Sequence, residues 1–258
     1  MLEETKKLKK IAICGCSDHK HMAPFDNDEF EIWGVNNLYH SINEVQMKNV
    51  GKWFEIHQIV NDGKNFIRRG SKDFRGQPVD MYLSQLAKLP CKVMMQQKWE
   101  QIPNSEVFPV KELMEMFKTD YFTNTISWEI AYALYLIERK EYLPHIGVWG
   151  VDMATNTGSI FSLPEYSHQR PSCEFWLGMC LGRGVTIEIP AESDLLKLRY
   201  LYGYQELEKS KWILKKENTA RALNDRMNKS AQQEQMANVQ RNQYIGALEM
   251  LKEMNKWD

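Results

Sequence analysis

Residues 10–17 read KIAICGCS, and this stretch decides the fold. The four residues after Lys10 form a continuous apolar run, without alternation of apolar and polar positions, and a glycine ends the run. Such runs are typical of strands buried on both faces, as in parallel sheets covered by helices. Five more such runs follow, at residues 30–35, 52–56, 91–95, 145–149 and 184–189. The sequence therefore predicts a mainly parallel sheet.

Helices are expected to connect these strands. Residues 127–140, SWEIAYALYLIERK, place apolar residues at helical spacing, and a second helix is expected around residues 175–181. Strand, helix and strand in this order form the βαβ unit. Residues 60–90 and 96–122 combine Gly, Pro and mixed polarity, so we expect long loops with short helices there. We predict an α/β fold in residues 1–203, a Rossmann-like, mainly parallel sheet flanked by helices.

Residues 204–258 are predicted to form a separate, helical C-terminal extension. They contain no Pro and a single Gly, at position 246. Leu and Met recur along this segment, but Asn and Gln dominate its middle, so the helix buries no face by itself. We expect it to pack on a partner or on a second copy of the chain, as in a homo-oligomer. A helix that lies back over the domain is the open alternative.

Composition excludes several classes of function. Lys and Arg number 33 against 34 Asp and Glu, a net charge of −1, so no global field attracts nucleic acid or anionic membrane, and we expect neither as a partner. The five cysteines fit neither a disulfide framework nor a zinc site, and His19 and His21 stand alone, so no metal is expected. The charged N-terminus and the lack of a long apolar run argue against secretion or membrane insertion. We expect a cytoplasmic protein.

Polar residues follow the predicted strands, at the edge where doubly wound folds bind ligands. Gly15 and Ser17 follow the first strand, Asn36 and Asn37 follow the second, and the third runs into Glu55 and His57. A turn or a loop cap would explain each of them equally well. The dinucleotide pattern G-x-G-x-x-G and the phosphate loop G-x-x-x-x-G-K-[ST] are absent, which argues against NAD and P-loop chemistry.

Two further junctions offer candidate ligand-binding residues. Thr125 and Ser127 open the helix predicted at 127–140, and free amides at such a helix start suit a phosphate or a carboxylate. Simple capping explains the same two residues. The fifth strand runs into Gly150 and Asp152.

The densest polar cluster is EYSHQR, residues 165–170, which is expected to lie in a loop. His168 could act as a general base near neutral pH, and Tyr166 could donate to a phosphate oxygen. Arg170 could pair with an anion, and Glu165 is a candidate substrate contact together with His57. A surface loop with a hydrogen-bonded histidine would have the same composition.

Taken in order, these junctions resemble the bacterial sialyltransferases of glycosyltransferase family 42, and more loosely the sialyltransferase-like domain of motility accessory factors. EIWGVNNLY, residues 31–39, is similar to the family pattern D-V-F-R-C-N-Q-F-Y, and GVDM, residues 150–153, to G-[IV]-D-[FL]. IPAESDLL, residues 189–196, is similar to the family's strand end with Pro and Ser-Leu-Leu. The chain also looks like uncharacterised bacteriophage proteins that have a helical tail.

The resemblance implies an inverting, metal-independent transfer from a nucleotide-sugar, with no further cofactor. It implies that Asn36 contacts the nucleotide, that His168 is the general base and that Tyr166 assists the departing phosphate. Cys16 and Ile126 stand where the family has nucleotide-contacting Asn and Ser. The alternative is therefore a non-catalytic nucleotide-binding or nucleotide-sequestering protein, such as one that a phage directs against host defence.

Overall fold

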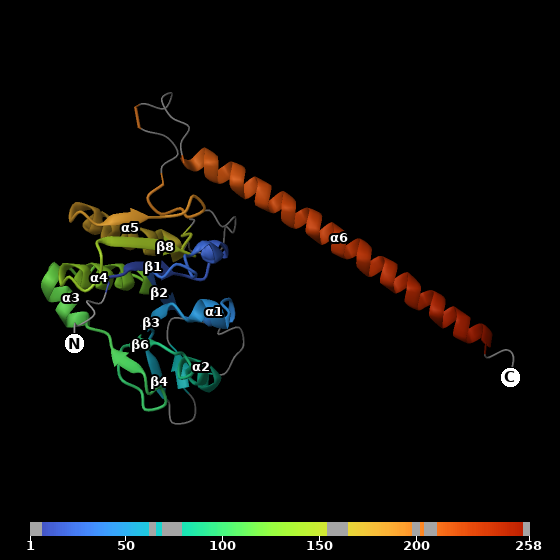
Figure 1. Ribbon diagram of the computed structural model, residues 1–258, viewed down its shortest axis with the longest axis horizontal. Helices are drawn as coiled ribbons and strands as arrows, with labels where there is room; N and C mark the ends of the chain where they lie inside the picture. The colour runs from blue at the N-terminus through green and yellow to red at the C-terminus, as the bar shows by residue number, and fades with distance from the viewer. Residues whose placement is uncertain are drawn as a thin grey trace. The chain divides into compact units, whose positions relative to one another are not determined.

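The computed structural model describes residues 7–61, 66–68, 79–153, 165–197, 202–203 and 211–254. The chain divides into two compact units, Met1–Leu196 and Lys197–Asp258 (Figure 1). Each unit is described by itself.

A seven-stranded sheet forms the centre of the first unit, with the order β7-β6-β3-β2-β1-β8-β9. All of its described pairings are parallel, which confirms the predicted α/β, Rossmann-like fold. The strands are β1 (Lys10–Cys14), β2 (Phe30–Val35), β3 (Val50–Glu55), β6 (Lys92–Met95), β7 (Ser105–Val107), β8 (His145–Trp149) and β9 (Thr186–Glu188).

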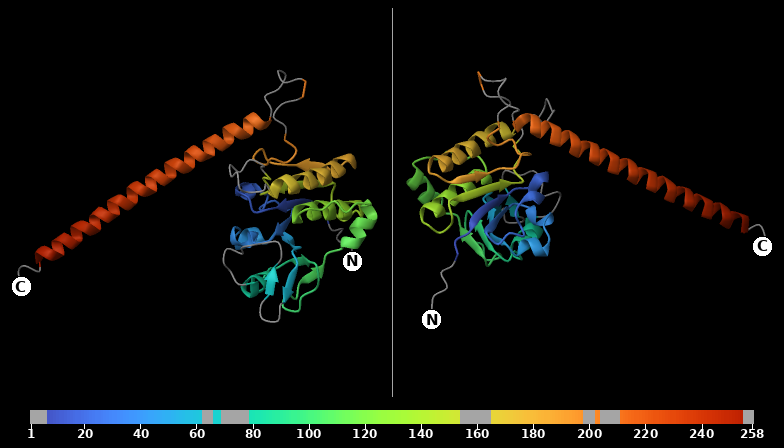
Figure 2. Two further views of the ribbon diagram at one scale, coloured as in Figure 1. Left: turned by 180° about the vertical axis from the view of Figure 1, so that it is seen from behind. Right: turned by 45° about the horizontal axis from the view of Figure 1, so that its top comes forward.

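Helices cover both faces of this sheet (Figures 1 and 2). On one face, the side chains of Ile11 and Ile13 join a core with α3 (Val110–Phe117), α4 (Thr125–Glu138) and α5 (Glu165–Gly182). On the other, Ala12 and Cys14 join a core with α2 (Val79–Leu86), α1 (Glu44–Met47) and the short 3-10 helix η2 (Leu38–His40). A second 3-10 helix, η1 (Asp18–Met22), follows β1. The alternating side chains of β1 are thus fully buried on both faces, as its apolar run predicts.

The segments that we expected to be long loops contain more regular structure. β4 (Ile59–Asn61) and β5 (Phe66–Arg68) form an antiparallel pair, and β7 adds an edge strand to the main sheet. β7 reads Ser-Glu-Val, and two of its three residues are exposed. A short edge strand needs no apolar run, so hydrophobicity alone does not detect it.

Helix α5 corrects a second expectation. It begins at Glu165, so residues 165–170 lie in its first turns and not in a loop before a helix at 175–181. The first turns are polar and therefore show no apolar helical spacing. Pro171 also argues against a helix at this point, because proline removes a backbone donor.

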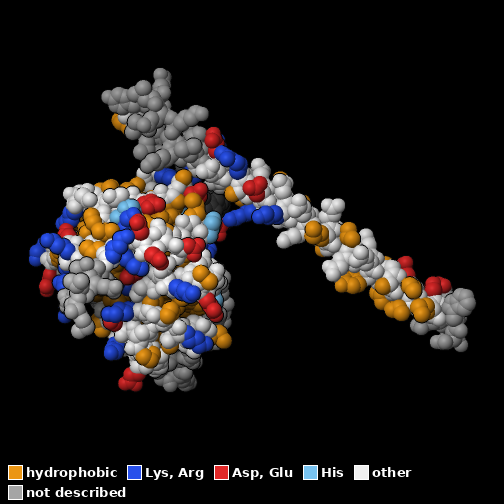
Figure 3. All heavy atoms as spheres, in the orientation of Figure 1, with side chains coloured by type: hydrophobic (Ala, Val, Ile, Leu, Met, Phe, Trp, Pro, Cys, Tyr) orange, Lys and Arg blue, Asp and Glu red, His pale blue; other side chains and the backbone are white. Residues whose placement is uncertain are grey.

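The second unit contains one long helix, α6 (Lys211–Met254), of 44 residues. Its described side chains are almost all exposed, and Figure 3 shows hydrophobic side chains along it. The large exposed ones are Leu223, Met227, Met236, Val239, Tyr244, Ile245, Leu248, Met250, Leu251 and Met254. Among the described residues, none of the helices has both the length and the apolar character of a membrane span.

Helix α4 buries one carboxyl group completely. Glu129 is 0% exposed, and neither of its side-chain oxygens has a hydrogen-bond partner within the described residues. Burial raises the pKa of this carboxyl well above its ordinary value, because the charged form loses its hydration. A folded-state pKa above the unfolded one means that folding retains a proton at pH values where the unfolded chain releases it.

We expect Glu129→Gln to become more stable relative to the wild type as the pH rises above about 4.5, the ordinary glutamate value. Above that pH the native Glu129 carboxyl costs stability at up to about 1.4 kcal/mol per pH unit, until its folded pKa is reached. Urea unfolding at about pH 5 and about pH 8 measures the difference. Glu115→Gln, at an exposed position of α3, is the matched control. An identical pH dependence in Glu129→Gln and wild type would contradict this account.

Candidate functional site

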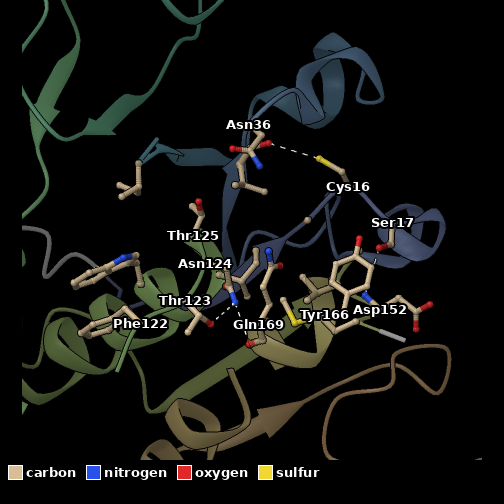
Figure 4. A pocket seen from close by; sticks show the side chains of 18 of the residues that line it. Cys16, Ser17, Asn36, Phe122, Thr123, Asn124, Thr125, Asp152, Tyr166 and Gln169 are labelled. Carbon is tan, nitrogen blue, oxygen red and sulfur yellow. Dashed lines mark hydrogen bonds between the residues drawn. The ribbon is translucent and has the colours of Figure 1, made fainter. Parts of the chain in front are cut away.

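A cleft of about 720 Å³ lies at the carboxyl ends of the strands (Figure 4). The chain leaves β1 toward β2 on one side and later returns to β8 on the other, so this cleft sits at the topological switch point of the sheet. The described lining residues are Gly15, Cys16, Ser17, Val35, Asn36, Ile56, His57, Phe122, Thr123, Asn124, Thr125, Ile126, Trp128, Gly150, Val151, Asp152, Met153, Tyr166 and Gln169.

Two glycines lie back to back where β1 and β8 end. The Gly15 amide donates to the Trp149 carbonyl, and the Ser17 amide to the Gly150 carbonyl, each at 2.8 Å. A Cβ atom at either glycine would lie 2.4 Å from the carbonyl oxygen of the other. Gly150 also has a φ of +64°, a conformation that glycine adopts without strain. The two strand ends can therefore approach closely only as glycines.

Two other lining residues have left-handed backbone conformations. Asn36, directly after β2, has a φ of 51°, and Met153 has a φ of 53°. The neighbouring strand β3 holds Asn36 in place: the Asn36 amide donates to the Phe54 carbonyl at 3.2 Å, and the Asn36 carbonyl accepts from the Trp53 indole at 3.0 Å. Such conformations cluster at ligand sites, where the surrounding fold compensates their cost.

The start of α4 presents free amides to the cleft. Asn124 caps the helix, because its Oδ1 accepts from the Ser127 amide at 2.9 Å. The amides of Thr125 and Ile126, in the first turn, have no acceptor within the helix. Ser127 itself is fully buried, and its hydroxyl donates to the Asn124 carbonyl at 2.7 Å. Of the two predicted residues here, Thr125 lines the cleft and Ser127 does not.

The first turns of α5 are tied to the start of α4. The Thr123 hydroxyl donates to the His168 carbonyl, and the Asn124 amide group to the Gln169 carbonyl, both at 3.0 Å. These bonds orient Tyr166 and Gln169 toward the cleft, as Figure 4 shows.

The structure brings most of the predicted residues together. Eight of them line the cleft: Gly15, Ser17, Asn36, His57, Thr125, Gly150, Asp152 and Tyr166. Of the others, Asn37 lies beside Cys16, with its Oδ1 3.6 Å from the thiol. Arg170 pairs with Glu174 at 2.8 Å. Exposed His168 is absent from the described lining. Glu165 begins α5, and its side chain lies outside the described part.

Two aromatic cleft residues escape sequence reasoning. Phe122 and Trp128 form an apolar wall, with stacked rings. Glu55, the last residue of β3, is absent from the described lining but is buried next to His57, with its Oε1 2.7 Å from the ring Nδ1. In the sequence, Glu55 stands out as a carboxylate in the otherwise apolar stretch WFEI. Burying a carboxylate is costly unless a partner binds it, so such a residue indicates a buried hydrogen-bonded or ionic contact.

The described residues include no group of three or more His, Cys, Asp or Glu placed to hold a metal ion. The polar side chains of the cleft are amides, hydroxyls, one thiol, one imidazole, one indole and one carboxylate, at Asp152. Such donors and acceptors suit a phosphorylated organic ligand.

Cys16 provides a direct probe of the cleft. It is the exposed thiol among five free cysteines. Burial raises the pKa of each of the others to about 12: Cys14, Cys91, Cys173 and Cys180. An aromatic disulfide reagent should therefore modify one thiol per folded chain quickly and all five after unfolding. Cys16→Ser should lose the fast reaction, and fast modification of a second thiol would contradict the structure.

No family model, curated protein or solved structure matches this chain.

Proposed function

We propose that the switch-point cleft binds a nucleotide or a nucleotide-sugar, and that the protein transfers the glycosyl group to an acceptor hydroxyl by inversion, without a metal ion. One observation carries the proposal: Gly15, Asn36 and Asp152 meet the first-turn amides of α4 in a single cleft. These amides and the helix dipole favour a phosphate. Asn36 and Asp152 supply the hydrogen-bonding groups that a base or a ribose requires.

The width of the cleft favours an extended ligand. The carboxyl ends of β3 and β8 both contribute to the lining, and three strand spacings separate them in the order β3-β2-β1-β8. Neighbouring strands are about 4.8 Å apart, so these ends lie roughly 14 Å apart. A lone phosphate is too short to contact both. A nucleotide joined to a sugar has the required length.

The geometry suggests a role for three groups in the transfer. The amides of Thr125 and Ile126 would neutralise the departing phosphate, and the Tyr166 hydroxyl, which also lines the cleft, would donate to it. These donors are fixed before the ligand arrives, because Asn124 and the α5 carbonyls hold the loop.

A non-catalytic nucleotide-binding or sequestering protein is the second candidate. The placement of His168 favours it, because this predicted base is absent from the described lining of the cleft. Both candidates require ligand binding, and only the first requires turnover of the donor.

A thermal-shift screen of nucleotides, cyclic nucleotides and nucleotide-sugars tests both candidates. A ligand at 100 times its dissociation constant stabilises the fold by about 2.7 kcal/mol. For a domain of this size the expected rise in Tm is roughly 5 to 11 °C. A hit whose glycosyl donor is also consumed supports the transferase, and a hit that stays intact supports the binding protein. If no compound of these classes shifts the Tm, the proposal is wrong.

Two substitutions at Thr125 distinguish the contribution of its backbone amide to ligand binding from that of its side chain. Thr125→Pro should weaken binding of a screen hit roughly 10- to 100-fold, the loss of one hydrogen bond to a charged group. Proline is tolerated at the first helical position, and the extended backbone of Asn124 (φ −164°, ψ 168°) suits a residue before proline. Thr125→Ala keeps the amide and should bind more tightly than Thr125→Pro. Calorimetry with wild-type affinity for Thr125→Pro would exclude the amide as a phosphate ligand.

The state of the cysteines supports a reducing compartment. All five are free, and four of them are buried in the core. We place the proposed activity in the cytoplasm on this ground.

A homo-oligomer formed through α6 is a separate part of the proposal. Exposed Leu248 and Leu251 lie three residues apart, on one side of the helix, and such a stripe is stabilised by a second copy. Light scattering of the full chain should give a multimeric mass, and Leu248→Glu with Leu251→Glu should lower it. Lys252→Glu, in the same turn, is the control. A monomeric wild type would contradict this part.

A further inference from the structure

A hydrogen-bonded cluster lies beneath one end of the cleft, where β3 ends. The carboxylate of Glu55 is 0% exposed. One of its oxygens, Oε1, accepts from the His57 backbone amide at 3.1 Å and lies 2.7 Å from His57 Nδ1. The other, Oε2, accepts from the hydroxyl of Tyr82 in α2. Several donors thus hold this buried carboxylate in one orientation.

The cluster fixes the histidine for proton transfer. A carboxylate on Nδ1 keeps the proton on that nitrogen and stabilises the ring when it becomes charged, so exchange with a ligand proceeds through Nε2. His57 lines the cleft, and 26% of its side chain is exposed. Among the described lining residues it is the one histidine.

We propose that His57 is the general base of the transfer and that Glu55 is its positioning residue. This inference rests on the proposed glycosyl transfer. The acceptor hydroxyl oxygen forms a bond to the anomeric carbon while the bond from that carbon to the donor phosphate breaks. The bonding electrons leave with the phosphate, and the hydroxyl proton passes to Nε2 of His57. No oxidant, reductant or metal is needed for this balance.

The position of His57 also indicates the class of acceptor. His57 and Ile56 follow β3, at the opposite end of the cleft from Asp152, which follows β8. Phe122 and Trp128 line the cleft as well, and they pack, like Ile56, against the same hydrophobic core. The acceptor is therefore a hydroxylated molecule with an apolar face, such as a sugar, that can lie against these rings.

The test compares single-histidine variants of the full chain with the donor found in the screen. His57→Ala should lower donor turnover roughly a hundred- to ten-thousand-fold and leave donor binding within a few-fold of wild type. Added imidazole should restore part of the turnover, because a small base can enter the vacated space. His145→Ala is the matched control. His145 lies at the amino end of β8, away from the carboxyl ends that line the cleft, and pairs with Glu188 at 3.1 Å. His168→Ala tests the alternative assignment of the general base to His168.

A double-mutant cycle tests the positioning role of Glu55. Glu55→Gln should lower turnover in the wild-type background and cause no further loss in the His57→Ala background, since the two residues act as one unit. A merely structural role of Glu55 would lower turnover in both backgrounds. Thermal unfolding of each variant verifies that the fold persists.

The outcomes separate this inference from the function on which it rests. Full turnover in His57→Ala, or loss in His168→Ala with none in His57→Ala, overturns the role of His57 and leaves the transfer intact. A wild type that binds donors but consumes none overturns the transfer and this inference together, and leaves only the binding site. Loss in His57→Ala with rescue by imidazole supports the assignment.

Discussion

The parallel pairing of β1 with both β2 and β8 is the interaction on which the rest of the first unit depends. A parallel sheet buries both faces, so helices must cover it on two sides. The same pairing brings every carboxyl end to one edge. Because the chain turns in opposite directions from the centre of the sheet, the loops after β1 and β8 diverge and leave a crevice between them. The cleft is therefore a consequence of topology before any side chain is considered.

Sequence reasoning recovers the parts of the fold that depend on burial. The bounds predicted for the first, second and fifth strands agree with β1, β2 and β8, because these strands are predominantly apolar. It fails where structure needs no hydrophobic signal. β7 is a short, exposed edge strand, and the first turns of α5 are polar and contain Pro171. Such segments are specified by contacts with neighbours that are remote in the sequence.

The residues of the candidate site likewise differ in how well the sequence predicts them. Residues close to the ends of strands, such as Asn36 and Asp152, are predictable, because a strand end fixes their place in space. The order of motifs along the chain predicts His168 as a site residue, but it lies exposed in α5 and is absent from the described lining. The end of the third strand marks Glu55 as a candidate polar residue, but it reveals neither the complete burial of the carboxylate nor its partners. Its partnership with Tyr82 joins residues 27 positions apart, which no local pattern reveals.

The back-to-back glycines at positions 15 and 150 affect how natural variation in this protein should be interpreted. Each lacks a side chain because the other's carbonyl oxygen occupies the space, so selection would keep both even in a chain that had lost its ligand. Invariance of this pair among homologues would therefore not by itself indicate ligand binding. Co-inheritance of Glu55 with His57 would instead be a signature of chemistry, since a core position under no such selection would drift toward an aliphatic residue.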